Sequence, residues 1–176
     1  MFWLKILSDF IKIFREGQDP KQVAWGFALG SIVGLSPILT LQGLLVWILI
    51  FILNVNLAAA FLAFSVFSIF AYLLDPAFHW IGFQVLTQIQ NLSGLWTDMY
   101  NAPIAPLTIF NNTVVIGSFL CALVLFVPVY FLMKYFIVQY RKHIGAKVEK
   151  WKVFKIMKQS SLVKWYEKVR DLGGLR

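Results

Sequence analysis

Side chains that could do chemistry are few in this chain, and two of them lie one helical turn apart. Asp75 and His79 are four residues apart, so on one helix they would share a face and could exchange a proton. The simpler interpretation is that Asp75, followed by Pro76, caps a new helix and that His79 is a surface residue. The second histidine, His143, and the single cysteine, Cys121, are distant in sequence. We therefore predict no catalytic residues, no metal site and no cofactor.

A second group of polar side chains surrounds Pro37. Ser36, Thr40 and Gln42 lie close together in an otherwise apolar stretch. A proline ends or kinks a helix and frees backbone groups, which these side chains could satisfy. Broken helices of this kind form ligand sites in transporters, and a helix that began at Pro37 would favour an anion. Ser36, Pro37, Thr40 and Gln42 are therefore the candidate ligand or lipid path.

The composition is typical of a membrane protein. Hydrophobic residues make up 60% of the 176 residues and charged residues only 14%, against about 25% charged residues in soluble domains. Residues 22–74 and 99–133 contain no charge, and each stretch exceeds the roughly 20 residues that cross a bilayer. A charge inside a bilayer is kept only for function, so its absence argues against an ion-coupled pump.

The charge distribution predicts that both termini lie in the cytoplasm. The net charge is +8, and residues 22–133 contain no Lys or Arg, only Asp75 and Asp98. Basic residues gather instead in residues 1–21 and 134–176. By the positive-inside rule, the number of complete crossings is then even. The absence of basic residues from 22–133 also argues against an enzyme that acts on lipid phosphates. The terminal lysines adjoin apolar segments, so membrane lipid is a better partner for them than nucleic acid.

Surface helices are predicted on both sides of a membrane domain of residues 19–138. In residues 1–17 the polar and apolar side chains separate onto two faces, which predicts an amphipathic helix lying in the membrane interface. Residues 139–176 are predicted to form a basic amphipathic tail on the cytoplasmic side. Asp19 is predicted to cap a helix that starts at Pro20.

Two geometries fit residues 23–53, which Pro37 divides into two arms shorter than a bilayer core. The segment is either one long broken crossing or a re-entrant hairpin that returns to the side from which it came. We favour the hairpin, because residues 57–74 then cross outward and residues 114–133 cross back. A broken crossing would require residues 77–96 to cross as well.

A polar stripe makes residues 77–96 poorly suited to crossing a membrane. On one helix its members would share a face without any charge, which is typical of a helix at the outer surface or, alternatively, of one that lines a polar cavity. The stripe consists of Gln84, Thr87, Gln88 and Asn91. Further along the chain, residues 111–113 are predicted to cap the last span and Pro128 to kink it.

Three glycines at four-residue spacing, Gly26, Gly30 and Gly34, form a stripe on the first membrane helix. Glycine costs about 1 kcal/mol per residue relative to alanine inside a helix. In lipid, small residues allow helix backbones to approach closely and gain dispersion contacts. The stripe is therefore predicted to pack against another helix. Its occupant is either the arm after Pro37 or the span that contains Ala58, Ala59, Ala60 and Ala63.

The glycine-spaced block resembles the opening block of the bacterial membrane family catalogued as domain of unknown function 2062. The matching positions are Ala24, Gly26, Phe27, Gly30, Gly34, Pro37, Gly43 and Asn56. That family typically continues with an Asn-Pro pair, and Asp75-Pro76 stands at the corresponding place with aspartate instead of asparagine. The resemblance covers residues 19–95 and brings no established chemistry.

The resemblance implies a location in the bacterial inner membrane and a protein partner. One subfamily of this length looks like the gene neighbour of a large membrane-anchored envelope protein that resembles bridge-like lipid-transfer proteins. The function that this implies is a non-enzymatic subunit that assists the larger partner in lipid transport across the envelope. The alternative is a homo-oligomeric channel or facilitator for a small polar or anionic solute.

The residue patterns together predict an all-α fold. The expected molecule is a small polytopic membrane protein with a broken or re-entrant helical hairpin, two or more full spans, and interfacial amphipathic helices at both ends.

Overall fold

The computed structural model describes residues 19–143, and this part of the chain is helical without any strand. Its α-helices are α2 (Pro20–Leu35), α3 (Leu41–Ile52), α4 (Leu57–Phe83), α5 (Ser93–Asn101) and α6 (Thr113–His143). Shorter elements are the π-helical turn η1 (Gln84–Gln88) and the 3-10 turns η2 (Gln90–Leu92) and η3 (Ala105–Thr108). The all-α prediction is confirmed for this range. The surface helix predicted at 1–17 and the tail from residue 144 lie outside the described residues, while residues 139–143 belong to α6.

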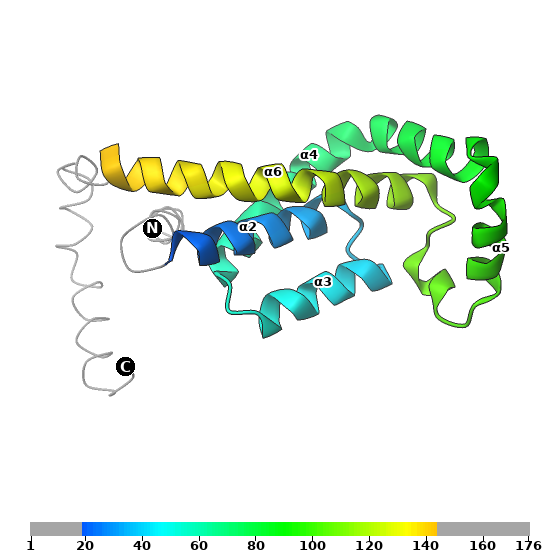
Figure 1. Ribbon diagram of the computed structural model, residues 1–176, viewed down its shortest axis with the longest axis horizontal. Helices are drawn as coiled ribbons and strands as arrows, with labels where there is room; N and C mark the ends of the chain where they lie inside the picture. The colour runs from blue at the N-terminus through cyan, green and yellow to red at the C-terminus, as the bar shows by residue number, and fades with distance from the viewer. Residues whose placement is uncertain (1–18, 144–176) are drawn as a thin grey trace.

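Helices α2, α4 and α6 pack against one another, and α3 folds back beside them (Figure 1). The chain reverses direction between α2 and α3, so α3 runs back toward the end at which α2 began. The backbone amide of Asn56, just before α4, donates to the carbonyl oxygen of Gln22 at 3.1 Å. This hydrogen bond joins the two ends of a helical hairpin that spans α2 and α3.

The first helix begins as predicted. The carboxylate of Asp19 accepts a hydrogen bond from the backbone amide of Lys21 at 2.9 Å, and Pro20 occupies the first helical position. This arrangement satisfies one of the amides that every helix start leaves free, and proline has no amide to lose at that position. The helix then ends at Leu35, immediately before Ser36 and Pro37.

The second arm of the hairpin starts later than predicted. A helix beginning at Pro37 was expected, but α3 begins at Leu41 with Thr40 as its N-cap. The hydroxyl oxygen of Thr40 accepts from the amide of Gly43 at 3.2 Å and donates to the carbonyl of Pro37 at 3.0 Å. A threonine side chain can satisfy a free helix amide whereas a proline side chain cannot. The N-cap residue Thr40 therefore determines where α3 starts.

The glycine stripe of α2 packs against the first half of α4, the alanine-rich span. A Cβ added at Gly30 would collide with the backbone carbonyl of Ala60, and one added at Gly34 would lie 2.8 Å from the carbonyl oxygen of Phe64. Gly26 is equally close to the residue that precedes α4. Of the two occupants considered, α4 is therefore the correct one.

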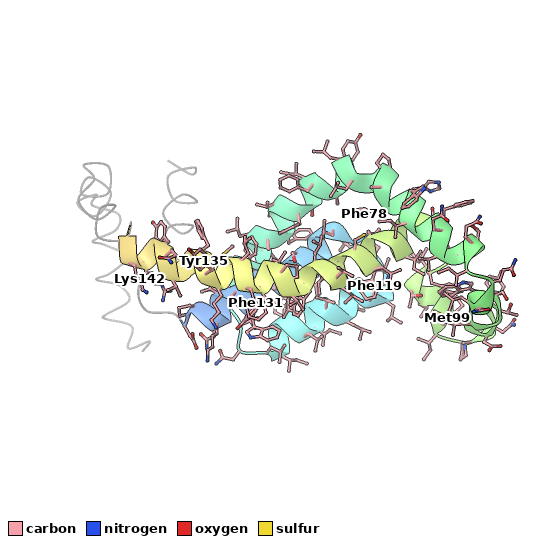
Figure 2. All side chains as sticks on the ribbon, turned by 45° about the horizontal axis from the view of Figure 1, so that its top comes forward. Phe78, Met99, Phe119, Phe131, Tyr135 and Lys142 are labelled. Atoms are coloured by element: carbon pink, nitrogen blue, oxygen red, sulfur yellow. The ribbon has the colours of Figure 1, made fainter. Side chains whose placement is uncertain are left out.

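Helix α4 runs through Asp75 and Pro76, so the prediction that Asp75 caps a new helix is wrong. Pro76 removes the amide that would bond to the carbonyl of Tyr72, which ordinarily kinks a helix. Figure 2 shows that α4 bends along its course but does not end. The helix continues because Phe78 and Gly82, beyond the proline, are buried in packing.

A second glycine contact fixes this far half of α4 on the start of α6. A Cβ added at Gly82 would collide with the carbonyl of Thr113, and one added at Gly117 would collide with the carbonyl of Phe78. The two backbones thus touch at a pair of reciprocal glycines. This contact holds α4 on a helical path where local sequence alone favours a stop.

Helix α6 starts at its predicted cap. The side-chain oxygen of Asn112 accepts from the amides of Val114 at 2.9 Å and Val115 at 3.2 Å. Pro128 lies inside the helix without ending it, and Figure 2 shows that α6 curves along its length.

Two helical stretches in the described range are long and apolar enough to cross a membrane, Leu57–Gln88 and Thr113–Lys142. Much of their apolar surface faces outward: the exposed fraction is 81% for Tyr72, 75% for Val124 and 73% for Leu132. The buried core is small and is centred on α2, which contributes its glycines and the side chains of Val23, Ala24, Ala28 and Val33.

Candidate functional site

The turn between α2 and α3, residues 36–40, carries polar groups without partners. Ser36 is 5% exposed, and its buried hydroxyl oxygen has no hydrogen-bond partner in the part of the chain that the structure describes. Within residues 19–143, no acceptor pairs with the backbone amides of residues 38–42. Leu39 at the turn is 91% exposed. The turn therefore carries unpaired hydrogen-bond donors beside an exposed apolar side chain.

Gln42 connects this turn to a second region, the cap, which we define as residues 84–112. Its side-chain amide donates to the backbone carbonyl of Thr108 in η3 at 3.0 Å, and its amide oxygen is buried without a partner. Figure 1 shows that α5, the helix of the cap, lies beyond one end of the bundle. The hairpin turn and the cap thus occupy the same end of the molecule.

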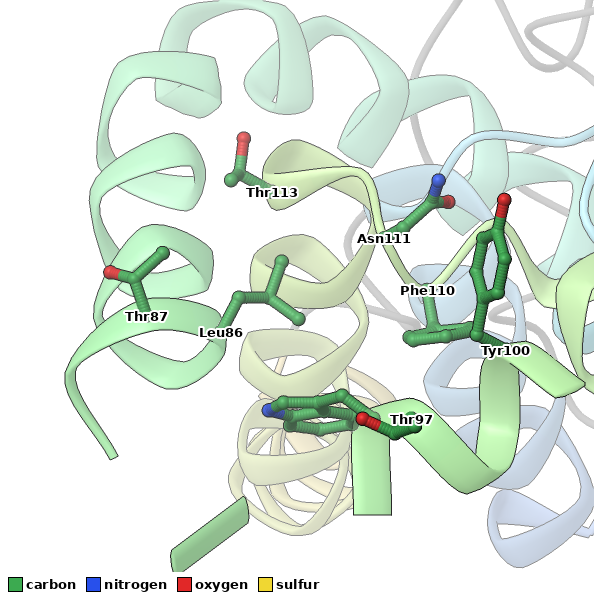
Figure 3. A pocket seen from close by; sticks show the side chains of 8 residues that line it. Leu86, Thr87, Thr97, Tyr100, Phe110, Asn111 and Thr113 are labelled. Atoms are coloured by element: carbon green, nitrogen blue, oxygen red, sulfur yellow. The ribbon is translucent and has the colours of Figure 1, made fainter. Parts of the chain in front are cut away.

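The cap forms an open pocket of about 470 Å³ at the surface of the molecule. Figure 3 shows Leu86 and Thr87 of η1 on one side and Tyr100 and Phe110 on the other, with the Leu86 side chain pointing toward Phe110. The remaining lining residues are Trp96, Thr97, Asn111 and Thr113. None of these side chains carries a charge.

Three aromatic side chains give the pocket its apolar surface. The rings of Trp96 and Phe110 stack with centroids 5.9 Å apart at an interplanar angle of 21°. Trp96 and Tyr100 are four residues apart, so α5 places both on one face, toward the pocket. The indole Nε1 of Trp96 is buried and has no hydrogen-bond partner among residues 19–143. An unpaired indole N–H of this kind is uncommon, because buried indole N–H groups are usually hydrogen-bonded.

Most hydroxyl groups around the pocket are already bonded within the protein. Thr87 donates to the carbonyl of Phe83 at 2.8 Å, and Thr97 donates to that of Ser93 at 3.0 Å. The hydroxyl oxygen of Thr113 lies 2.7 Å from Nδ1 of His79. His79 therefore joins α4 to the start of α6, and no hydrogen bond links it to Asp75 one turn away.

The polar stripe predicted on residues 77–96 does not lie on one helix face. The α-helix ends at Phe83, continues as the π-helical turn η1 to Gln88, and is followed by the separate turn η2, which contains Asn91. Of the four stripe residues, Thr87 lines the pocket, whereas Gln84, Gln88 and Asn91 do not. The predicted stripe assumed the 100° rotation per residue of an α-helix. A π-helical turn has a smaller rotation per residue, so the side chains in and after it point in other directions.

Sequence reasoning missed the aromatic residues of the pocket. Trp96 and Tyr100 at helical spacing in the short segment after the stripe were the available signal. Phe110 could not be linked to them from the sequence, because the reversal of the chain through η3 brings it beside Trp96.

Comparison with known proteins identifies the family to which the chain belongs. The model of the family described as "Uncharacterized protein conserved in bacteria (DUF2062)" matches residues 5–144, most of the chain. The chain belongs to the DUF2062 family. The match extends on both sides of the block that carried the resemblance, residues 19–95, and includes the cap and α6. No curated protein and no solved structure matches the chain.

Proposed function

We propose that this DUF2062 protein is a multi-pass subunit of the bacterial inner membrane that holds a lipid at the cap end and assists a larger partner in moving lipid across the envelope. The proposal has no enzymatic step. The observation that carries it is the pairing of an uncharged pocket with a hairpin turn that has free backbone amides, both at one end of an apolar bundle.

Exposed apolar surface supports the membrane location. Both long helices present large apolar side chains to their surroundings, and the charges of α2 and α6 stand at the end of the bundle opposite the cap. Val23 and Ala24 of α2 pack with Met133 and Ile137 of α6, which places Lys21 and Lys134 near each other. By the positive-inside rule, this end is cytoplasmic and the cap is on the outer side.

Helix lengths support a re-entrant hairpin. Helix α2 has 16 residues and α3 has 12, which correspond to about 24 Å and 18 Å. Neither reaches across a hydrocarbon core of about 30 Å. A hairpin that enters from the cytoplasmic side would therefore turn in the outer leaflet. Two full crossings, by α4 and α6, then leave both termini in the cytoplasm.

The turn explains why lipid is the preferred ligand. Backbone amides without partners are costly in hydrocarbon, so those of residues 38–42 need water or a headgroup. Lipid phosphate oxygens are acceptors available at that depth, and the 91% exposed side chain of Leu39 can lie among acyl chains.

The alternative, a homo-oligomeric channel, has less support. The glycine stripe of α2 was the surface best suited to joining copies of the chain in lipid. Its contact face is instead filled by α4 of the same chain.

Purification of the full chain from the membrane with its lipids retained tests the proposal. We expect bound phospholipid at about one molecule per chain and, under mild solubilisation, a larger membrane-anchored protein in constant ratio. Quantitative lipid extraction and cross-linking mass spectrometry would measure both. A purified homo-oligomer that conducts a small solute in liposomes and holds no phospholipid would contradict the proposal.

A further inference from the structure

We infer that the cap pocket binds the ammonium group of a zwitterionic lipid headgroup. The inference rests on the proposed lipid role and names the class of headgroup. It is carried by aromatic side chains that line a pocket without a charged lining residue, in a cap (residues 84–112) whose one charged residue is the carboxylate Asp98.

The aromatic side chains supply the attraction. A cation over the face of Trp, Tyr or Phe is attracted by the quadrupole of the ring, and Trp is the strongest of the three. The ring of Trp96 stacks on that of Phe110, which is 7% exposed and so supports the indole, and Tyr100 lies at the side of the pocket. Such rings bind both primary and quaternary ammonium groups.

The charge of the cap favours a ligand with a positively charged group. Between residues 22 and 133 the chain has two charged residues, Asp75 and Asp98, and no Lys or Arg. Asp98 lies on α5 directly after the lining residue Thr97 but does not itself line the pocket, and Asp75 lies on α4, outside the cap. As the one charged residue of the cap, Asp98 favours a positively charged group there over an isolated phosphate or a carboxylate.

The hydrogen-bonding groups fit the remainder of a headgroup. A phosphate or ester oxygen of the same lipid can accept hydrogen bonds from neutral donors that line the pocket. Asn111 can donate to such an oxygen through its amide. A pocket of about 470 Å³ accommodates a headgroup while its opening lets the acyl chains leave toward the bilayer.

Native mass spectrometry of the detergent-purified full chain tests the inference. The probes are phosphatidylethanolamine, phosphatidylcholine, phosphatidylglycerol and a glucosyl diacylglycerol with identical acyl chains, together with soluble glycerophosphoethanolamine. We expect the two ammonium lipids to bind about fivefold more tightly than phosphatidylglycerol, as cation–π attraction predicts. The soluble headgroup would bind more weakly than its lipid but would compete with it.

Variants assign the effect to the pocket. Trp96→Leu should weaken phosphatidylethanolamine binding about five- to tenfold, while Trp96→Phe, which keeps a ring, should stay within about threefold. The matched control is Trp80→Leu, because Trp80 is 62% exposed on α4 and does not line the pocket. If Trp96→Leu does not purify as a folded protein, Tyr100→Leu replaces it, since Tyr100 is 67% exposed and its loss leaves the core intact.

The outcomes separate the inference from the proposed function. Equal binding of phosphatidylglycerol, preferential binding of the glucolipid, or full binding by Trp96→Leu and Tyr100→Leu would overturn the ammonium site while a lipid role remained. Absence of every phospholipid from the purified chain would overturn the proposed function itself.

Discussion

At the scale of single residues, the close packing of the helices depends on glycines, which have no side chain. Gly26, Gly30 and Gly34 bring α2 against α4, and Gly82 and Gly117 bring α4 against α6. At each position the neighbour is a backbone carbonyl, which cannot rotate away as a side chain can. The cost of glycine in a helix is thus offset by close packing along two separate contacts.

Gly30→Ala is expected to destabilise the protein. The new Cβ would collide with the carbonyl of Ala60, so α2 and α4 would have to separate along their length. Overpacking of this kind costs about 1–3 kcal/mol. The matched control is Gly94→Ala, because nothing lies within 4 Å of a Cβ at Gly94. Thermal unfolding in detergent should show a lower Tm for the first variant and an equal or higher Tm for the second. Equal Tm values for the two variants would contradict the tight contact.

Asn56→Ala is expected to weaken the start of α4. The side-chain oxygen of Asn56 accepts from the amide of Ala59 at 2.7 Å, and the residue is 8% exposed. Loss of an N-cap costs about 0.5–2 kcal/mol. Asn56→Ser keeps an acceptor and should retain most of the stability, as measured by the same thermal unfolding. A loss equal to that of alanine would show that the amide side chain matters through another contact.

At the scale of elements, the sequence was informative wherever a local signal decided the outcome. Three features that depend on chemistry within a few residues were predicted. They are the start of α2 at Asp19 and Pro20, the break at Pro37 and the N-cap of α6 at Asn112. The error at Pro76 has the opposite origin. A proline normally ends a helix, but distant packing of Gly82 on α6 holds α4 together.

The cap could not be predicted for a related reason. Its pocket combines residues from η1, α5 and the segment before α6, which meet through turns that leave no periodic signal. Of the predicted ligand residues, Gln42 forms a hydrogen bond to Thr108 in the cap, and Thr40 is the N-cap residue of α3. Their types were visible in the sequence, but their partners were not.

Gln42→Leu is expected to loosen the link between the hairpin and the cap. The variant removes the hydrogen bond to the Thr108 carbonyl, a loss of about 1 kcal/mol. Hydrogen–deuterium exchange should accelerate in residues 105–112 with little change in α4. Gln88→Leu is the matched control. The side chain of Gln88 forms a hydrogen bond only with that of its neighbour Thr87 among the described residues. Unchanged exchange in 105–112 would show that the cap is held by other contacts.

At the scale of the whole molecule, the two ends of the bundle differ in chemistry. One end carries Lys21, Lys134 and Lys142, while the other carries the cap with its neutral pocket. The hydrogen bond from Asn56 to Gln22 places the α3–α4 connection at the basic end, and that from Gln42 to Thr108 places the α2–α3 turn at the cap end. Whatever the orientation of the bundle, these two connections should therefore lie on different sides.

Cysteine labelling in a Cys121→Ser background tests this arrangement in intact cells. Asn54→Cys reports the α3–α4 connection, and Gly94→Cys reports the cap, where Gly94 has open space around it. Because the basic end is expected to be cytoplasmic, a membrane-impermeant maleimide should label position 94 in intact cells and position 54 only after permeabilisation. Labelling of both positions from outside would make residues 20–53 a complete crossing and reject the re-entrant hairpin. Protection of position 94 with labelling of position 54 would invert the bundle and place the pocket, with any lipid that it holds, on the cytoplasmic side.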